Sequence, residues 1–125
     1  MNQAIHSEKA PAAIGPYSQA LLAGNTLYIS GQIPIVRETG EFAGADVESQ
    51  TRQVLVNIGH ILHEAGFDYK DVVKTTVLLT DIGEFAAMNQ VYAAFFQEPY
   101  PARAAFQVVN LPKGAKVEIE AVAVR

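Results

Sequence analysis

Residues 47–65 read VESQTRQVLVNIGHILHEA and carry the clearest helical signal in the sequence. Their apolar side chains recur at i, i+1, i+4, i+7, i+8 and i+11, a spacing that places them on one stripe of a helix. They are Val54, Leu55, Ile58, Ile61, Leu62 and Ala65. Asp46 is a suitable N-cap, and Gly66 stands where helices commonly end in a glycine. The stretch predicts one amphipathic helix with a single buried face.

The residues after this helix predict a strand and a second helix. Residues 72–80 are rich in β-branched side chains and indicate a central strand. Asp81, with Glu84 three residues later, forms a variant of the capping box and begins a second helix. Pro99 and Pro101 end it. The expected apolar face of this helix consists of Phe85, Met88, Tyr92, Phe95 and Phe96.

Four further strands are expected around these elements. Residues 17–30 form a hairpin with its turn at Gly24-Asn25, and a second turn lies at 38–40. Residues 102–109 and 116–124 form the last two strands. The final strand alternates strictly, with Val117, Ile119, Ala121 and Ala123 on one face and Glu118 and Glu120 on the other.

The predicted order β-β-α-β-α-β-β describes an α+β fold, in which a single mixed β-sheet has two helices packed on one face. Two helices can cover only one face of a sheet. The other face still carries apolar groups, for example Val122 and Val124. Because an uncovered apolar face favours association, the sequence predicts an oligomer, without fixing the number of subunits.

Length and composition restrict the class of protein. The 125 residues, half of them hydrophobic, suit one packed domain spanning 1–125. Because cysteine is absent, disulfides, thiolate nucleophiles and cysteine-based zinc sites are excluded. We expect a cytoplasmic protein, because no signal peptide or membrane-spanning stretch is apparent. The net charge of -4, without a run of Lys or Arg, argues against nucleic acid as the main ligand.

Arg103 is the first candidate for chemistry. It stands in a predicted strand whose other residues are small or apolar, where a permanent positive charge needs an anionic partner. The planar fork of a guanidinium suits a carboxylate held by two hydrogen bonds. One hypothesis is therefore a clamp for a substrate carboxylate. The alternative is a structural ion pair with Glu118 or Glu120.

Further candidates have both structural and functional interpretations. A carboxylate such as Glu118 in an apolar cleft passes protons near neutral pH, although two solvated acids explain Glu118 and Glu120 equally simply. Tyr17 follows a turn that places its phenol at a cleft edge, although tyrosine is also common at interfaces. Asn89 is expected to be a buried amide that caps backbone. At Ser30-Gly31, glycine lets a ligand approach the backbone.

Metal binding is not expected. His60 and His63 are three residues apart on the first helix, which is not the spacing of the His-Glu-x-x-His motif. They flank the apolar stripe, and too few ligands accompany them for a zinc site.

Several motifs, in order along nearly the whole chain, resemble one family. They are Ala10–Gln19 (APAAIGPYSQ), Ser30–Pro34 (SGQIP), Val73–Val77 with Met88–Tyr92, Pro101–Arg103, and Leu111–Lys113 with Val117–Ala121. The family is that of the RidA (YjgF-type, L-PSP-type) imine deaminases. The resemblance implies a chorismate-mutase-like fold, which assembles as a homotrimer around a central β-barrel with clefts between neighbouring subunits.

The resemblance also implies roles. Arg103 matches the arginine that binds the substrate carboxylate, Glu118 matches the acid that positions water, and Tyr17 matches a tyrosine at the cleft. Ser30, Gly31 and Asn89 match positions that line or support the pocket. The implied reaction is cofactor-independent hydrolysis of 2-aminoacrylate, 2-iminobutyrate and related enamines or imines to 2-keto acids and ammonia. Pyridoxal-phosphate-dependent dehydratases would release these substrates.

One position departs from the family pattern. Many bacterial members have Ser-Cys after the arginine, whereas this chain has Ala104-Ala105, which places any thiol role in doubt.

Two other functions remain open. Members of the family also carry the label of endoribonuclease or translation inhibitor, and a non-catalytic 2-keto-acid-binding module or chaperone is the third possibility.

Overall fold

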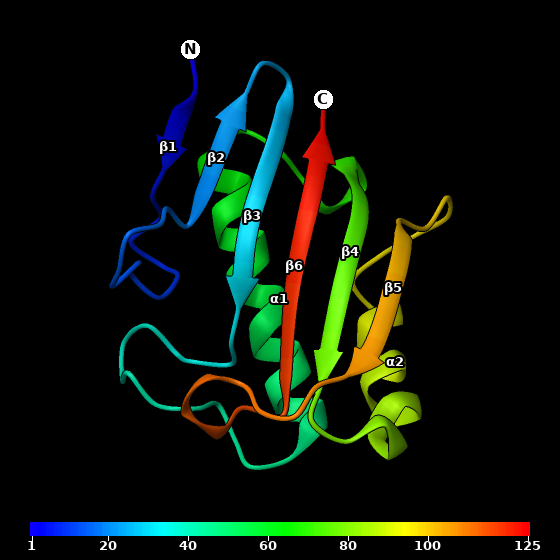
Figure 1. Cartoon of the computed structure of the whole chain (residues 1–125). Coiled ribbons are helices and arrows are strands. Elements are labelled where there is room, and N and C mark those ends of the chain that lie inside the picture. Colours follow the sequence, from blue (N-terminus) through cyan, green and yellow to red (C-terminus); the bar gives the residue numbers. More distant parts are fainter.

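One six-stranded sheet with two helices behind it forms the chain (Figure 1). The computed structural model describes all of residues 1–125. The strands are β1 (Gln3–Ile5), β2 (Ala20–Ala23), β3 (Thr26–Gln32), β4 (Val72–Leu79), β5 (Ala102–Gln107) and β6 (Val117–Val124), and the helices are α1 (Val47–Glu64) and α2 (Phe85–Ala93). Neither helix is both long enough and apolar enough to span a membrane.

The sheet is mixed, as predicted. Its strand order is β1-β2-β3-β6-β4-β5, and β4 and β5 pair in parallel while every other neighbouring pair is antiparallel. The expected hairpin is present as β2 and β3, which join at Gly24. Strand β1 was not predicted, because three residues are too few to display an alternating pattern.

Helix α1 begins and ends where the sequence predicts. The Asp46 carboxylate accepts a hydrogen bond from the Ser49 backbone N–H at 2.9 Å. At the other end Gly66 adopts φ 80°, a left-handed conformation that favours glycine, and its N–H donates to the His63 carbonyl at 3.0 Å. These caps satisfy backbone groups that a helix end otherwise leaves unpaired.

The second helix differs from the prediction at both ends. Asp81 caps a 3₁₀ turn (Ile82–Glu84) rather than α2, and its carboxylate accepts from the Gly83 N–H. Glu84 does not close a capping box; its carboxylate lies 3.8 Å from the Lys116 ammonium. The helix ends at Ala93, so Phe95 and Phe96 follow it rather than continue its face. Phe96 nevertheless belongs to the core.

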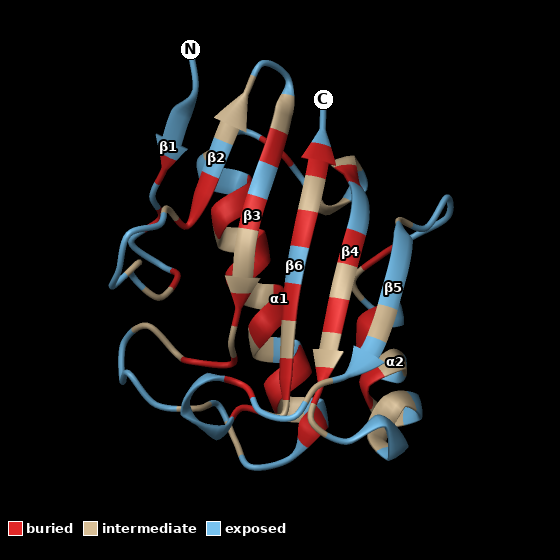
Figure 2. Ribbon diagram, viewed as in Figure 1, coloured by how far each residue is buried: buried red, intermediate tan, exposed pale blue.

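The two faces of the sheet are chemically different. Both helices lie against one face, where the predicted alternation of β6 buries Val117, Ile119, Ala121 and Ala123 (Figures 1 and 2). No helix covers the other face. Large apolar side chains are exposed on that open face, namely Leu21, Tyr28, Phe106 and Val124. They stand beside the two glutamates of β6, so the open face combines apolar surface with acid groups.

Candidate functional site

Arg103 lies on the helix-covered face of the sheet, at the edge strand β5. Its partner in the register of β4 and β5 is Thr75, which is only 1% exposed and faces the helices. Because directly paired residues point to the same face, the Arg103 side chain extends toward α2. Helix α2 therefore supplies the surroundings of this guanidinium.

Three side chains of α2 hold the guanidinium. Arg103 Nη1 donates to Asn89 Oδ1 at 2.6 Å. The guanidinium carbon lies 4.7 Å from the ring centre of Tyr92 and 5.3 Å from that of Phe85, which are cation–π distances. Tyr92 is held in turn by Thr75, since their two hydroxyl oxygens are 2.7 Å apart. The cluster, defined as Thr75, Phe85, Asn89, Tyr92 and Arg103, fixes the direction of the charge.

No carboxylate neutralises Arg103. The four ion pairs of the chain involve other residues, so the expected alternative of a structural pair with Glu118 or Glu120 is wrong for this chain. A cleft of about 490 Å³ lies beside the guanidinium and is lined by Asn89, Tyr92, Ala93, Tyr100, Pro101 and Arg103. The hydrogen bond to Asn89 uses only one nitrogen of the Arg103 guanidinium, so the other N–H groups are free to bind an anion in that cleft.

The Asn89 side chain therefore has a different hydrogen-bond partner from the expected one. The sequence predicted a buried amide that caps backbone, but the side chain is half-buried and accepts from Arg103. The sequence also assigned Phe85 and Tyr92 only to the core. Residues 85, 89 and 92 follow the i, i+4, i+7 spacing of one helix face, and this spacing is the signal that places them together.

A second cluster surrounds Glu118 on β6. An added Cβ at Gly31 would overlap the Glu118 carboxylate, so the absence of a side chain at this position makes room for the acid. Glu118 is half-buried, and this burial raises the pKa of its carboxyl above the ordinary value. The neighbouring negative charge of Glu120 raises the pKa further. The carboxyl is thus suited to proton transfer closer to neutral pH than a solvated glutamate.

Ser30 and Tyr17 belong to the same end of the sheet. The Ser30 hydroxyl donates to the Ser18 carbonyl at 2.6 Å and so fixes the chain immediately after Tyr17. Tyr17 itself is 53% exposed. A cleft of about 320 Å³ nearby is lined by Ser18, Leu21, Tyr28, Ile29, Ser30 and Glu120.

Arg103 and Glu118 point from opposite faces of one sheet. Within β4, Thr75 pairs with Arg103 and Leu78 pairs with Glu118. Positions 75 and 78 differ by three residues, and strand side chains alternate between the faces. The two groups are also separated by β4, which lies between β5 and β6. Within a single chain, the guanidinium and the acid cannot reach the same small molecule.

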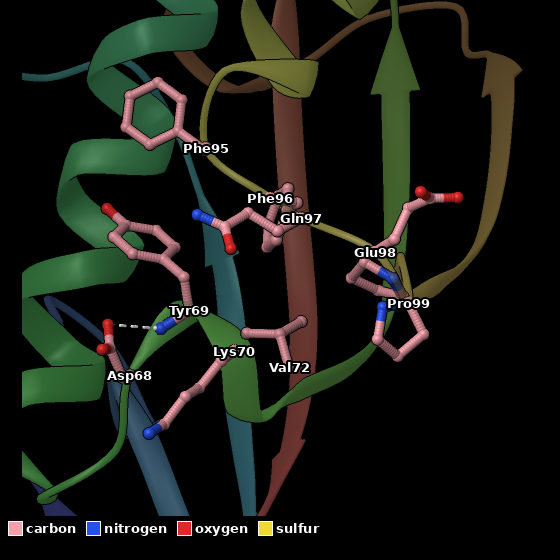
Figure 3. A pocket seen from close by; sticks show the side chains of 10 residues that line it. Asp68, Tyr69, Lys70, Val72, Phe95, Phe96, Gln97, Glu98 and Pro99 are labelled. Atoms are coloured by element: carbon pink, nitrogen blue, oxygen red, sulfur yellow. Dashed lines mark hydrogen bonds between the residues drawn. The ribbon is translucent and has the colours of Figure 1, made fainter.

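Another pocket, of about 320 Å³, lies between residues 68–72 and the segment 95–101 (Figure 3). The charged ends of Lys70 and Glu98 point away from one another there and do not converge on its centre (Figure 3). The Tyr69 hydroxyl is already used, because it donates to the Leu55 carbonyl at 2.6 Å. Polar groups that converge on a ligand are needed for specific binding, so this pocket is the weaker candidate.

The histidines of α1 do not form a metal site. His63 lies 3.5 Å from the Asp68 carboxylate, while His60 is half-buried and its pKa is lowered by burial. No group of three or more His, Asp or Glu side chains is arranged to hold a metal ion.

Comparisons with known proteins identify the family. The family model described as Endoribonuclease L-PSP matches residues 7–125. The 2-iminobutanoate/2-iminopropanoate deaminase of Capra hircus is 54% identical over 97% of this chain and 88% of its own. RidA from Psychrobacter sp. PAMC 21119 is 50% identical, with a TM-score of 0.95 over 98% and 99% of the two chains. E. coli TdcF, solved with bound serine, is 46% identical, with a TM-score of 0.93 over 98% of each chain. The chain therefore belongs to the Endoribonuclease L-PSP family, the RidA (YjgF-type) family that its motifs resemble.

Proposed function

We propose that this chain hydrolyses reactive 2-enamine and 2-imino acids, such as 2-aminoacrylate and 2-iminobutyrate, to 2-keto acids and ammonia. Relatives that are about half identical over nearly the whole chain carry the names of imine deaminases. The observation that carries the proposal is the guanidinium of Arg103, which is oriented by Asn89 and Tyr92 and lacks an acid partner. A short carboxylate is the ligand that its free donors fit.

The chemistry requires orientation and proton transfer. Arg103 holds the carboxylate, and the enamine takes a proton from solvent at its terminal carbon to give an iminium. Water adds to C2 and gives its proton to the Glu118 carboxylate. Glu118 returns that proton to nitrogen, the C2–N bond breaks with its electron pair on ammonia, and the hydroxyl proton leaves as the ketone forms. Acid–base catalysis of this kind contributes about 10²–10⁴-fold to a rate.

The site is proposed to lie between subunits of a homotrimer. Arg103 and Glu118 project from opposite faces of one sheet, so a complete site needs Arg103 from one copy and Glu118 from another. Tyr17, Ser30 and Gly31 accompany Glu118, and Asn89 accompanies Arg103. The exposed apolar side chains of the open face favour packing of the copies through that face.

A coupled assay tests the activity. A pyridoxal-phosphate-dependent serine or threonine dehydratase, the proposed cytoplasmic source of the substrate, generates the imine in the presence of this protein. We expect faster release of keto acid, without added metal or cofactor, than spontaneous hydrolysis gives. An unchanged rate would contradict the proposal, and tight binding of a 2-keto acid in that case would favour the non-catalytic module.

The ribonuclease alternative has less support. The chain carries a net charge of -4, and a protein that binds RNA through phosphates usually presents a basic surface. Steeply salt-dependent RNA binding by the pure protein would revive this alternative.

Gly31→Ala is predicted to lower kcat/KM by about tenfold, because the new methyl group displaces the Glu118 carboxylate and small misplacements of catalytic groups are costly. The coupled assay measures the effect. The control is the same substitution in a Glu118→Ala background, where it should cause no further loss. Equal losses in both backgrounds would indicate that Gly31 acts independently of Glu118.

Glu120→Gln is predicted to shift the pH profile. The negative charge of Glu120 raises the pKa of Glu118, so its removal should lower that pKa. If the ionised carboxylate of Glu118 accepts the proton from water, the acidic limb of kcat/KM moves to lower pH in the variant. Steady-state rates measured across the acidic range check this shift, and a limb that moves to higher pH would contradict the proposed role of Glu118.

A further inference from the structure

The side-chain amide of Gln19 is buried, only 2% exposed, at the start of β2. Its Oε1 accepts from the Ser7 N–H at 2.6 Å. Its Nε2 lies within hydrogen-bond distance of the carbonyls of Ser7 (3.2 Å), Ala10 (3.3 Å) and Pro11 (2.8 Å), which share its two N–H groups. All four partners lie in one segment, 8 to 12 residues earlier in the chain. A buried amide with this many partners holds the segment in one arrangement.

These hydrogen bonds close a loop. The Pro11 carbonyl is fixed by Gln19, and the Ser18 carbonyl is fixed by the Ser30 hydroxyl at 2.6 Å. Residues 12–17 therefore span two fixed points. Ile14 lies 81% exposed in this span, and Tyr17 stands at its end.

No side-chain hydrogen bond or aromatic ring pair within the chain involves Tyr17. Its backbone N–H donates to the Gly15 carbonyl at 2.8 Å, a contact inside the loop itself. Its ring lies 3.5 Å from the position that a Cβ of Gly15 would take, which is again a local contact. The place of the phenol thus depends on how the loop is closed at its two ends.

We propose that Gln19 is a positioning residue for the reaction: its amide closes the loop 12–17 and thereby holds the Tyr17 phenol toward the cleft of the neighbouring copy. The inference rests on the proposed function, because Tyr17 acts only if the site between copies exists. Because the loop is already ordered in the folded protein, its conformational entropy does not have to be lost when substrate binds.

The test is a double-mutant cycle with Gln19→Met, which keeps the length of the side chain and removes its hydrogen bonds. We expect Gln19→Met to lower kcat/KM by about tenfold, as a misplaced catalytic group does. In a Tyr17→Ala background the same substitution should lower it no further, because the group being positioned is gone. Equal losses in the two backgrounds would overturn the inference.

Gln50→Met is the matched control. The Gln50 amide is also buried; it donates to the Gly44 carbonyl at 2.9 Å and accepts from the Lys116 N–H at 2.8 Å, so it holds a different loop. Its effect on kcat/KM should be the same with Tyr17 or Ala at position 17. If Gln50→Met lowers kcat/KM in the native background and is silent in the Tyr17→Ala background, the coupling reports general loosening and the inference fails.

Amide hydrogen exchange supplies a readout that needs no turnover. The hydrogen-bonded amides of this segment, those of Ser7, Lys9, Ala10 and Tyr17, should lose protection in Gln19→Met and keep it in Gln50→Met. Unchanged protection in Gln19→Met would show that the Gln19 amide does not close the loop, and it would overturn the inference even if activity fell. If the native protein does not hydrolyse imines, the proposed function fails while exchange still decides whether Gln19 closes the loop. Should Gln19→Met not fold, Gln19→Asn, a neutral amide whose side chain is one methylene shorter, replaces it in both measurements.

Discussion

Arg103→Ala should lower kcat/KM for imine hydrolysis by about 10³-fold, because two charge-assisted hydrogen bonds of roughly 1.5–3 kcal/mol each are lost. The loss should appear in both kcat and KM, since the proposed role of the guanidinium is both to bind the carboxylate and to fix C2 near the acid. The coupled dehydratase assay, extended to high substrate concentrations, measures the two constants. In this variant the half-buried Asn89 side chain can form a hydrogen bond with water in place of Arg103, so we expect the variant to fold.

One further variant separates the planar shape of the Arg103 guanidinium from its positive charge, and a second variant serves as a control. Arg103→Lys keeps a positive charge but loses the planar fork and its stacking on Tyr92, so we expect an intermediate rate with a raised KM. Arg52→Ala removes an exposed arginine of α1 and should leave the rate unchanged. Comparable rates for Arg103→Ala and the native protein would remove the basis of the proposed function.

The elements that hydrophobic periodicity specifies were predicted well. Helix α1 and strand β6 begin and end within a residue of their expected bounds, because each has a long, regular pattern with one buried face. The end of α2 was misjudged, since Phe95 and Phe96 continue an apolar pattern after the backbone has left the helix. Strand β1 was missed because its pairing with β2 is a tertiary contact between short segments.

The site was predicted less completely than the fold. Residue types led to Arg103 and Glu118, but not to the faces from which they project, because the faces depend on the parallel pairing of β4 and β5. The sequence marks Tyr92 and Phe85 only as core residues, since an aromatic ring that packs inside a protein and one that supports a guanidinium follow the same helical spacing. The contacts of Gln19 left no local signal either, because they join positions 8 to 12 residues apart in an irregular segment.

Mixing two inactive variants should restore activity. Arg103 and Glu118 project from opposite faces of each chain, so each proposed site takes its guanidinium and its acid from different copies. Arg103→Ala and Glu118→Ala should each be nearly inactive alone. In the proposed homotrimer, any assembly that contains both variants has, by cyclic symmetry, one interface with an intact arginine facing an intact glutamate. Random reassembly of equal amounts should therefore recover about a quarter of the native activity.

The experiment requires unfolding the two variants together, refolding them, and comparing the product with a mixture that is never unfolded. The unmixed controls, each refolded alone, should stay inactive, and the native protein taken through the same cycle sets the full rate. A recovery near one quarter requires sites shared between copies, because a site contained in one chain would have lost an essential group in both variants. No recovery despite proven exchange of subunits would place Arg103 and Glu118 in separate sites, and the proposed pairing of these two groups across an interface would then have to be abandoned.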